Sequence, residues 1–195
     1  MWGPFRKSLI AQHLFYMEQA RTRLLSQFEN IEAEAHKAAD AWLEANQASF
    51  DPDLHDMGDA YEASNDAGIE FYQLLSDMRD QTRLSVVAGM FHEWDKQLRD
   101  WLSQEIRHLF PGETVNSKLW SVNFVQIAEL LQGLGWDIRS GAYYAKLDAC
   151  RCVVNVYKHG NGNSLDELKR SYPEFLVSSF STMAEFSPNV DWLDH

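Results

Sequence analysis

The sequence predicts an all-α fold: a helical bundle of four to five main helices, followed by a short C-terminal helix. Apolar residues recur every three to four positions along most of the chain, whereas the alternation typical of strands is scarce. The 195 residues include only five prolines, and these fall where one predicted helix gives way to the next. With 45% hydrophobic residues, the length suits one domain, expected over residues 1–180, with an irregular tail at 181–195.

The first element predicted is a long helix over residues 5–46. It starts just after Pro4, because proline is favoured in the first turn of a helix. Its apolar positions follow steps of three and four: Leu9, His13, Tyr16, Ala20, Leu24, Phe28, Ile31 and Ala35.

An acidic helix is predicted next, over residues 54–80, inside a strongly acidic stretch. Residues 40–80 carry a local charge of −10, nearly all of the net charge of −12. The acidic side chains are Asp40, Glu44, Asp51, Asp53, Asp56, Asp59, Glu62, Asp66, Glu70, Asp77 and Asp80, against one basic residue, Arg79. Three interpretations stay open: a solvated helix face, a docking surface for a basic protein partner, or a mimic of phosphate charge.

The core of the bundle is predicted over residues 82–176. A broad apolar stripe runs from Leu84 to Ile106, and a second one from Trp120 to Leu131. A further helix is expected over residues 140–159. Ser164 and Glu167 have the spacing of a capping box, with Ser164 at the N-cap, and open a short last helix before Pro173.

The helix around residue 150 carries the residues that could do chemistry. Arg151, Asn155 and His159 are four apart and therefore share one side of a helix. His159 stands in the last turn, just before Gly160, a residue expected at a helix C-terminus. The core seam of this helix is expected to be Tyr143, Leu147, Cys150, Val154 and Tyr157.

Arg151, Asn155 and His159 allow a chemical and a structural interpretation. An arginine can clamp a phosphate, a histidine can transfer protons, and an asparagine can orient either one. These are parts for cutting RNA through its own 2′-hydroxyl without a metal. Alternatively, Asp148 pairs with Arg151 three positions away, and His159 interacts with the negative end of the helix dipole.

The segment Leu147-Asp148-Ala149-Cys150-Arg151-Cys152-Val153-Val154-Asn155-Val156-Tyr157-Lys158-His159-Gly160 resembles a motif of bacterial HEPN-like (higher eukaryotes and prokaryotes nucleotide-binding) helical proteins. Gly162, Ser164, Leu168 and Tyr172-Pro173-Glu174-Phe175 extend the likeness. Upstream, Phe91-His92-Glu93-Trp94, with Leu98 and Trp101, is similar to the second helix of such bundles. The resemblance covers residues 84–176.

The resemblance implies a helical bundle, a homodimer, and a role in a toxin–antitoxin or phage-defence system. It also implies a metal-independent ribonuclease, with Arg151 on the scissile phosphate, His159 as general acid or base, and Asn155 in support. Seven residues separate Arg151 from His159, where the family has four to six. That spacing and the acidic stretch at 40–80 motivate the alternative, a non-catalytic interaction or regulatory protein that binds a protein partner through residues 40–80.

Composition excludes several classes of function. A sequence pI near 4.9 argues against general DNA binding, but residues 139–170 carry a local charge of +3, which leaves room for RNA at a local basic pocket. No signal peptide and no apolar run of about 20 residues is recognisable, so we expect a cytoplasmic protein without a membrane span. No cofactor or metal is expected, because the Glu105-x-x-His108 spacing has no second copy.

Overall fold

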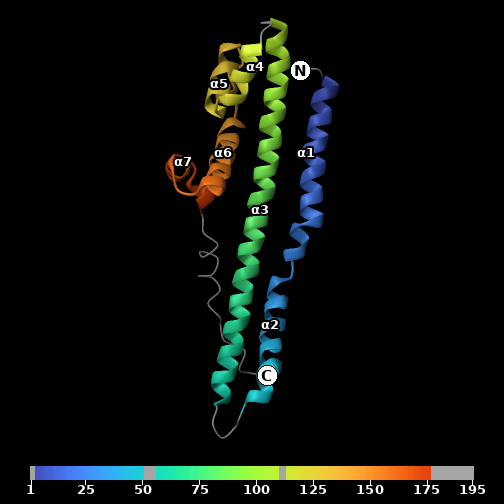
Figure 1. Cartoon of the computed structure of the whole chain (residues 1–195), viewed down its shortest axis with the longest axis vertical. Coiled ribbons are helices and arrows are strands. Elements are labelled where there is room, and N and C mark those ends of the chain that lie inside the picture. The colour runs from blue at the N-terminus through green and yellow to red at the C-terminus, as the bar shows by residue number, and fades with distance from the viewer. Residues whose placement is uncertain (1–2, 51–55, 110–112, 177–195) are drawn as a thin grey trace. The chain divides into compact units, whose positions relative to one another are not determined.

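The computed structural model describes residues 3–50, 56–109 and 113–176, and these form helices without a strand (Figure 1). The α-helices are α1 Gly3–Arg23, α2 Ile31–Asn46, α3 Met57–Leu109, α4 Glu113–Ser121, α5 Phe124–Gly133, α6 Tyr144–His159 and α7 Asn163–Ser171. Short 3₁₀ turns are η1 Leu25–Phe28, η2 Gln47–Ser49, η3 Ile138–Ser140 and η4 Pro173–Leu176. The all-α prediction is confirmed.

The chain divides into two compact units, residues 1–90 and 91–195, and the boundary falls within α3. We call them the N-terminal and the C-terminal unit and describe each by itself. The single domain expected over residues 1–180 stays a prediction. The tail expected at 181–195 lies outside the described residues.

The helix predicted over residues 5–46 is in fact two helices, because α1 ends at Arg23 and α2 begins at Ile31. Two hydroxyl-to-carbonyl bonds lie at the break. Thr22 donates to the Glu18 carbonyl at 2.9 Å, and Ser26 donates to the Thr22 carbonyl at 2.8 Å. Hydroxyls that bond the carbonyl four residues earlier compete with the backbone ladder and bend helices. Periodicity alone did not reveal this competition.

The break predicted between residues 80 and 82 is absent, because the acidic helix and the apolar helix after it are both part of α3, a helix of 53 residues. No proline lies between Pro52 and Pro111 to interrupt it. Asp80 also accepts from Arg79 and from Arg83, both at 3.2 Å, across the expected break. The pair of Asp80 and Arg83, three positions apart, favours continuation of the helix.

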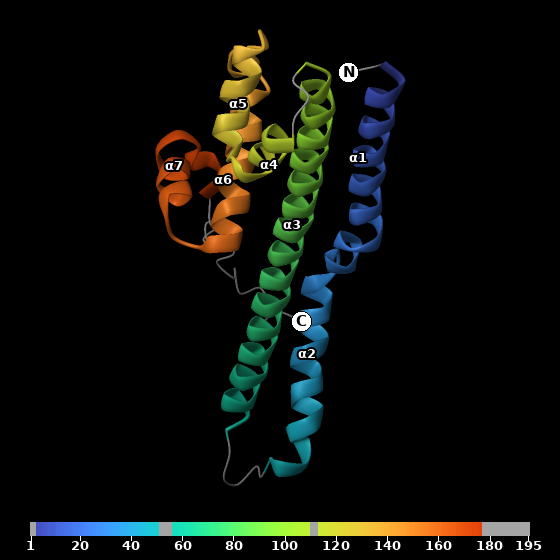
Figure 2. The same cartoon turned by 45° about the horizontal axis from the view of Figure 1, so that its top comes forward.

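In the N-terminal unit, α2 runs beside the first half of α3 in both views (Figures 1 and 2). Small residues let the two helices approach closely. The Ser64 hydroxyl donates to the Ala39 carbonyl at 2.9 Å. A Cβ added to Gly68 would lie 3.2 Å from the Ala35 carbonyl oxygen and 3.2 Å from the Ala39 Cβ. A side chain at position 68 would therefore crowd the backbone of α2, which glycine avoids.

The C-terminal unit has the main cluster of large buried side chains among the described residues: Trp101, Leu102, Leu119, Ile127 and Leu131. The buried Arg99 side chain donates to the carbonyls of Leu119 and Val122, at 2.7 and 2.9 Å, and so caps the end of α4. A reciprocal capping box of Asn123 and Gln126 then starts α5. These bonds fix the turn between α4 and α5.

Candidate functional site

The side chain of Arg151 lies between α6 and α7, where it has two carboxylate partners. Its Nε donates to Asp148 Oδ1 at 2.7 Å, and its Nη2 donates to Glu167 Oε2 at 2.7 Å. The side chains of Arg151 and Asp148 are only 12% and 10% exposed. Charge-assisted bonds of this length are strong where water is largely excluded. The guanidinium therefore connects α7 to α6. Its pair with Asp148 is the structural interpretation that the spacing of three positions allowed.

Glu167 has a different role from the one its sequence position suggested. The N-cap of α7 is Gly162, without a side-chain capping bond, so the box predicted for Ser164 and Glu167 is wrong. Because α7 begins at Asn163, Glu167 is the fifth residue of the helix, and its carboxylate bonds Arg151 on α6. Sequence reasoning missed this partner, since the two residues are 16 positions apart.

Tyr172 completes the bonding of Asp148. Its hydroxyl donates to Asp148 Oδ2 at 3.0 Å, while Arg151 occupies Oδ1, so both oxygens of the buried carboxylate have donors. Burial and the bond to Asp148 raise the pKa of Tyr172 to about 12. Burial lowers the pKa of Arg151, but its bonds to Asp148 and Glu167 raise it by more, so it lies above the usual value.

Cys152 is fully buried beside this group. Arg151 Nη2 lies 3.2 Å from its Sγ, and burial raises the pKa of the thiol to about 12. Donor atoms of Asp148, Cys152 and Glu167 lie within 4.8 Å of one another, close enough to hold a metal ion. The Arg151 guanidinium, however, already bonds all three, and a protonated thiol is a poor ligand. We therefore assign the positive charge in this cluster to Arg151.

The other two predicted site residues lie further along α6. Asn155 is half-buried, and His159 is exposed in the last turn. Gly160 follows with a φ of 70°, and its N–H bonds the Val156 carbonyl, as expected at a helix end. His159 follows Arg151 by eight positions, a rise of about 12 Å along the helix at 1.5 Å per residue. The bonds of Arg151 to Asp148 and Glu167 direct its guanidinium toward α7, about two turns of α6 before His159.

The expected core seam of α6 is partly wrong. Tyr143 is 59% exposed and Tyr157 is 37% exposed, whereas Asp148, Ala149, Cys152 and Val154 are buried. Polar residues on the buried face are tolerated because α7 and the turn after it supply partners for them. The side of α6 that carries Arg151, interpreted from the sequence as a chemical surface, thus lies in part against α7.

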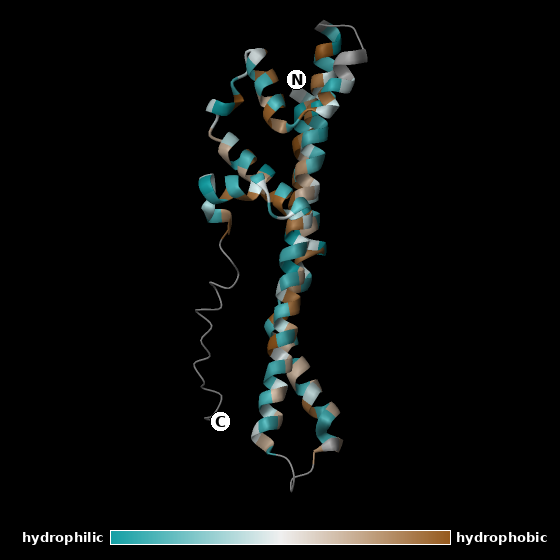
Figure 3. Ribbon diagram, turned by 60° about the vertical axis from the view of Figure 1, so that its left-hand side comes forward, coloured by the Kyte–Doolittle hydropathy of each residue, from teal (hydrophilic) through white to brown (hydrophobic). Residues whose placement is uncertain are grey.

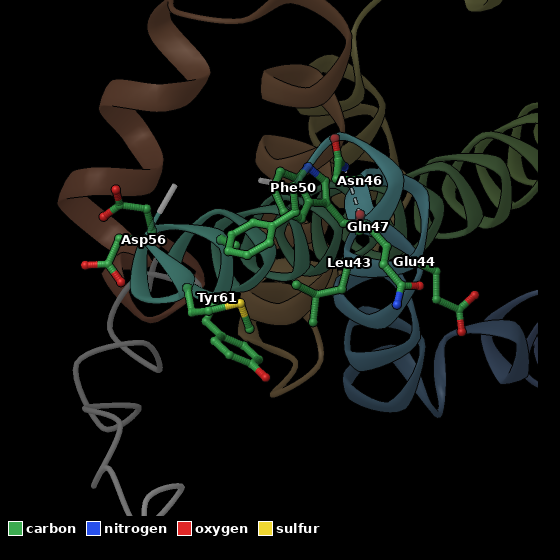
Figure 4. Close-up of a pocket in the computed structure, with 11 residues that line it drawn as sticks. Leu43, Glu44, Asn46, Gln47, Phe50, Asp56 and Tyr61 are labelled. Carbon is green, nitrogen blue, oxygen red and sulfur yellow. Dashed lines mark hydrogen bonds between the residues drawn. The ribbon is translucent and has the colours of Figure 1, made fainter. Parts of the chain in front are cut away.

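A second candidate site is a cavity of about 790 Å³ in the N-terminal unit, where α2 ends and α3 begins. The described residues that line it include three aromatic and three acidic side chains and none that is basic: Trp42, Leu43, Glu44, Asn46, Gln47, Phe50, Asp56, Met57, Asp59, Ala60 and Tyr61. In the view of Figure 4, Phe50 and Leu43 lie between the carboxylates of Asp56 and Glu44. We call this site the tip pocket.

The tip pocket is part of the acidic stretch predicted as a docking surface. Asp51 and Asp53 lie outside the described residues. Eight of the other carboxylates are exposed to solvent: Asp40, Glu44, Asp56, Asp59, Glu62, Asp66, Glu70 and Asp77. Asp80 is half-buried beside Arg79 and Arg83. The acidic stretch therefore presents most of its charge to solvent.

Comparison with known proteins adds no relative. No family model matches the chain, and neither a curated protein nor a solved structure matches it. The HEPN-like resemblance consequently stays an expectation. Among the described residues, no helix is both long and apolar enough to cross a membrane.

Proposed function

We propose that this chain is a non-catalytic, HEPN-like interaction protein that binds a basic segment of a protein partner at its tip pocket. The observation that carries the proposal is the position of Arg151 between Asp148 and Glu167. A phosphate would have to compete with two carboxylates for one largely buried guanidinium. Breaking such a pair leaves uncompensated charge and is costly.

The chemistry of the tip pocket supports a cationic side chain as its ligand. Aromatic faces attract ammonium and guanidinium groups, and nearby carboxylates add charge attraction. Trp42, Phe50 and Tyr61 supply the faces, and the exposed Glu44 and Asp59 also line the pocket. A segment rich in lysine or arginine has the matching charge for the exposed acidic stretch around the pocket.

Calorimetric titration of the full chain with a decalysine peptide tests this proposal. We expect binding at low salt that weakens as salt is raised. The triple variant Glu44→Gln, Asp59→Asn, Tyr61→Ala should weaken binding about tenfold, because it removes two charges and one aromatic face.

The matched control is Asp100→Asn, Glu174→Gln, Phe175→Ala, which changes exposed residues of the same types in the C-terminal unit. This variant should bind the peptide nearly as the unaltered chain does. Equal weakening in both triple variants, or no binding at low salt, contradicts the proposal.

A ribonuclease of a toxin–antitoxin or phage-defence system is the second candidate. The observation that favours it is the exposure of His159, the proposed acid or base, at the end of α6. Total RNA is incubated with the chain and with His159→Ala, both without metal. Cleavage by the unaltered chain alone would establish this candidate and overturn the non-catalytic one. Equal absence of cleavage from both folded proteins excludes it.

A further inference from the structure

The tip pocket combines apolar side chains and carboxylates in one place. Among its lining residues, Trp42, Leu43 and Ala60 are half-buried, whereas Met57 and Tyr61 are 52% and 59% exposed. Figure 3 shows hydrophilic and hydrophobic residues interspersed along α2 and the first half of α3. A cation that enters such a pocket gives up part of its water shell, and the free energy of that loss depends on the kind of cation.

The carboxylates of the tip pocket come from both sides of the connection between α2 and α3. Glu44 lies on α2, Asp56 directly precedes α3, and Asp59 lies in the first turn of α3. Asp56 Oδ1 accepts from the Gly58 N–H at 2.8 Å, so this carboxylate is held at the start of the helix. In Figure 4, apolar side chains separate the carboxylates of Glu44 and Asp56. A ligand that bonds carboxylates on both sides must present donors in more than one direction.

The chain itself supplies no strong cation to these carboxylates. No lysine or arginine occurs in the sequence between Lys37 and Arg79. Within the described part of the chain, Glu44, Asp56 and Asp59 form no ion pair. Their charge is therefore left for an external cation to balance.

Arg151 shows, elsewhere in this chain, how one guanidinium serves two carboxylates. Its Nε bonds Asp148 on α6 and its Nη2 bonds Glu167 on α7, each at 2.7 Å. A guanidinium is planar and has five N–H donors along its edges, whereas a lysine ammonium is a compact point charge. Carboxylates that come from two elements therefore fit a guanidinium better than an ammonium.

The aromatic residues of the tip pocket favour a guanidinium for a second reason. Trp42, Phe50 and Tyr61 line the pocket together with the carboxylates. A guanidinium stacks flat on an aromatic face while the donors on its edges still reach carboxylates. It is also more weakly hydrated than an ammonium, so it loses less hydration on entering a partly apolar site.

We propose that the tip pocket selects an arginine side chain of the partner segment over a lysine side chain. The guanidinium stacks on an aromatic face of the pocket and donates to carboxylates from both elements. This inference rests on the proposed function, because it names the basic side chain that the same site takes. A lysine-rich segment still binds, through charge attraction alone.

Calorimetric titration of the full chain with decaarginine and with decalysine compares the two side chains, because both peptides carry the same number of positive charges. At equal salt concentration, decaarginine should bind about tenfold more tightly. This preference should persist as salt is raised, because salt screens the charge attraction that both peptides share but not the stacking.

Substitutions of Tyr61 tie the preference to the pocket. Tyr61→Leu should reduce the preference for decaarginine to about threefold or less, and Tyr61→Phe, which keeps the aromatic face, should retain it. Tyr143→Leu is the matched control, because Tyr143 is also 59% exposed but lies in the C-terminal unit. Circular dichroism checks that each variant keeps its helices.

The outcomes separate this inference from the function on which it rests. Equal binding of the two peptides, or a preference that Tyr61→Leu leaves unchanged, overturns the selection of arginine but leaves the tip-pocket function in place. Failure of both peptides to bind at low salt contradicts the tip-pocket function itself, and the selection with it.

Discussion

Asp148, with its partners Arg151 and Tyr172, shows how a polar residue comes to be buried on α6. Both carboxylate oxygens have donors, so burial leaves no acceptor unpaired. The pair with Arg151 was predictable, because a spacing of three positions places two side chains on one helix face. The bond from Tyr172 to Asp148 and the bond from Arg151 to Glu167 were not predictable. Both depend on how α7 and the turn after it pack against α6.

Titration of Cys152 and Tyr172 makes the C-terminal unit sensitive to alkali. Both pKa values are raised to about 12, from 9.0 for the thiol and 10.0 for the phenol. A group with a raised pKa stabilises the folded state fully below its unfolded pKa and loses that effect as pH rises through the folded value. The free energy of unfolding should therefore fall between pH 9 and pH 12.

Urea denaturation at a series of pH values measures this fall. In Tyr172→Phe with Cys152→Ala, the loss between pH 9 and pH 12 should be smaller, because both groups are gone. His159→Ala serves as the control, since that side chain is exposed and outside the cluster. An unchanged slope in the double variant would show that other groups govern the alkaline transition.

At the scale of elements, periodicity predicted helices well and their ends poorly. The last turn of α6 at His159 and Gly160 was predicted, because a glycine with positive φ is a local signal. The end of α1 was missed, because the apolar pattern continues past Arg23 to Leu24, Phe28 and Ile31. The seam of α6 was partly misplaced, because buried ion pairs do not follow apolar periodicity.

The close approach of α2 and α3 gives a prediction at this scale. Gly68→Leu should destabilise the N-terminal unit by about 1–3 kcal/mol, because the new side chain meets the backbone at Ala35 and the methyl group of Ala39. Gly133→Leu is the control, since a Cβ there meets no atom within 4 Å. Urea denaturation followed by circular dichroism compares them, and equal stability would contradict the packing described here.

At the scale of the whole molecule, the two candidate sites lie in different units. The C-terminal unit contains most of the segment that resembles HEPN-like proteins. The Arg151 guanidinium in this segment, however, is paired with Asp148 and Glu167. The N-terminal unit holds the exposed carboxylates of the acidic stretch and the tip pocket. We infer that binding to other proteins depends mainly on the N-terminal unit. In the C-terminal unit, the bonds of Arg151 serve to hold α6 and α7 together.

The pairing of Arg151 with Glu167 decides between a structural and a chemical role for the arginine. A double-mutant cycle of Arg151→Met and Glu167→Gln, measured as free energies of unfolding of the full chain, tests it most directly. The account predicts that the two changes are coupled by about 1–3 kcal/mol, since each removes the partner of the other. Effects that add within about 0.3 kcal/mol would contradict it and return Arg151 to the candidates for phosphate binding.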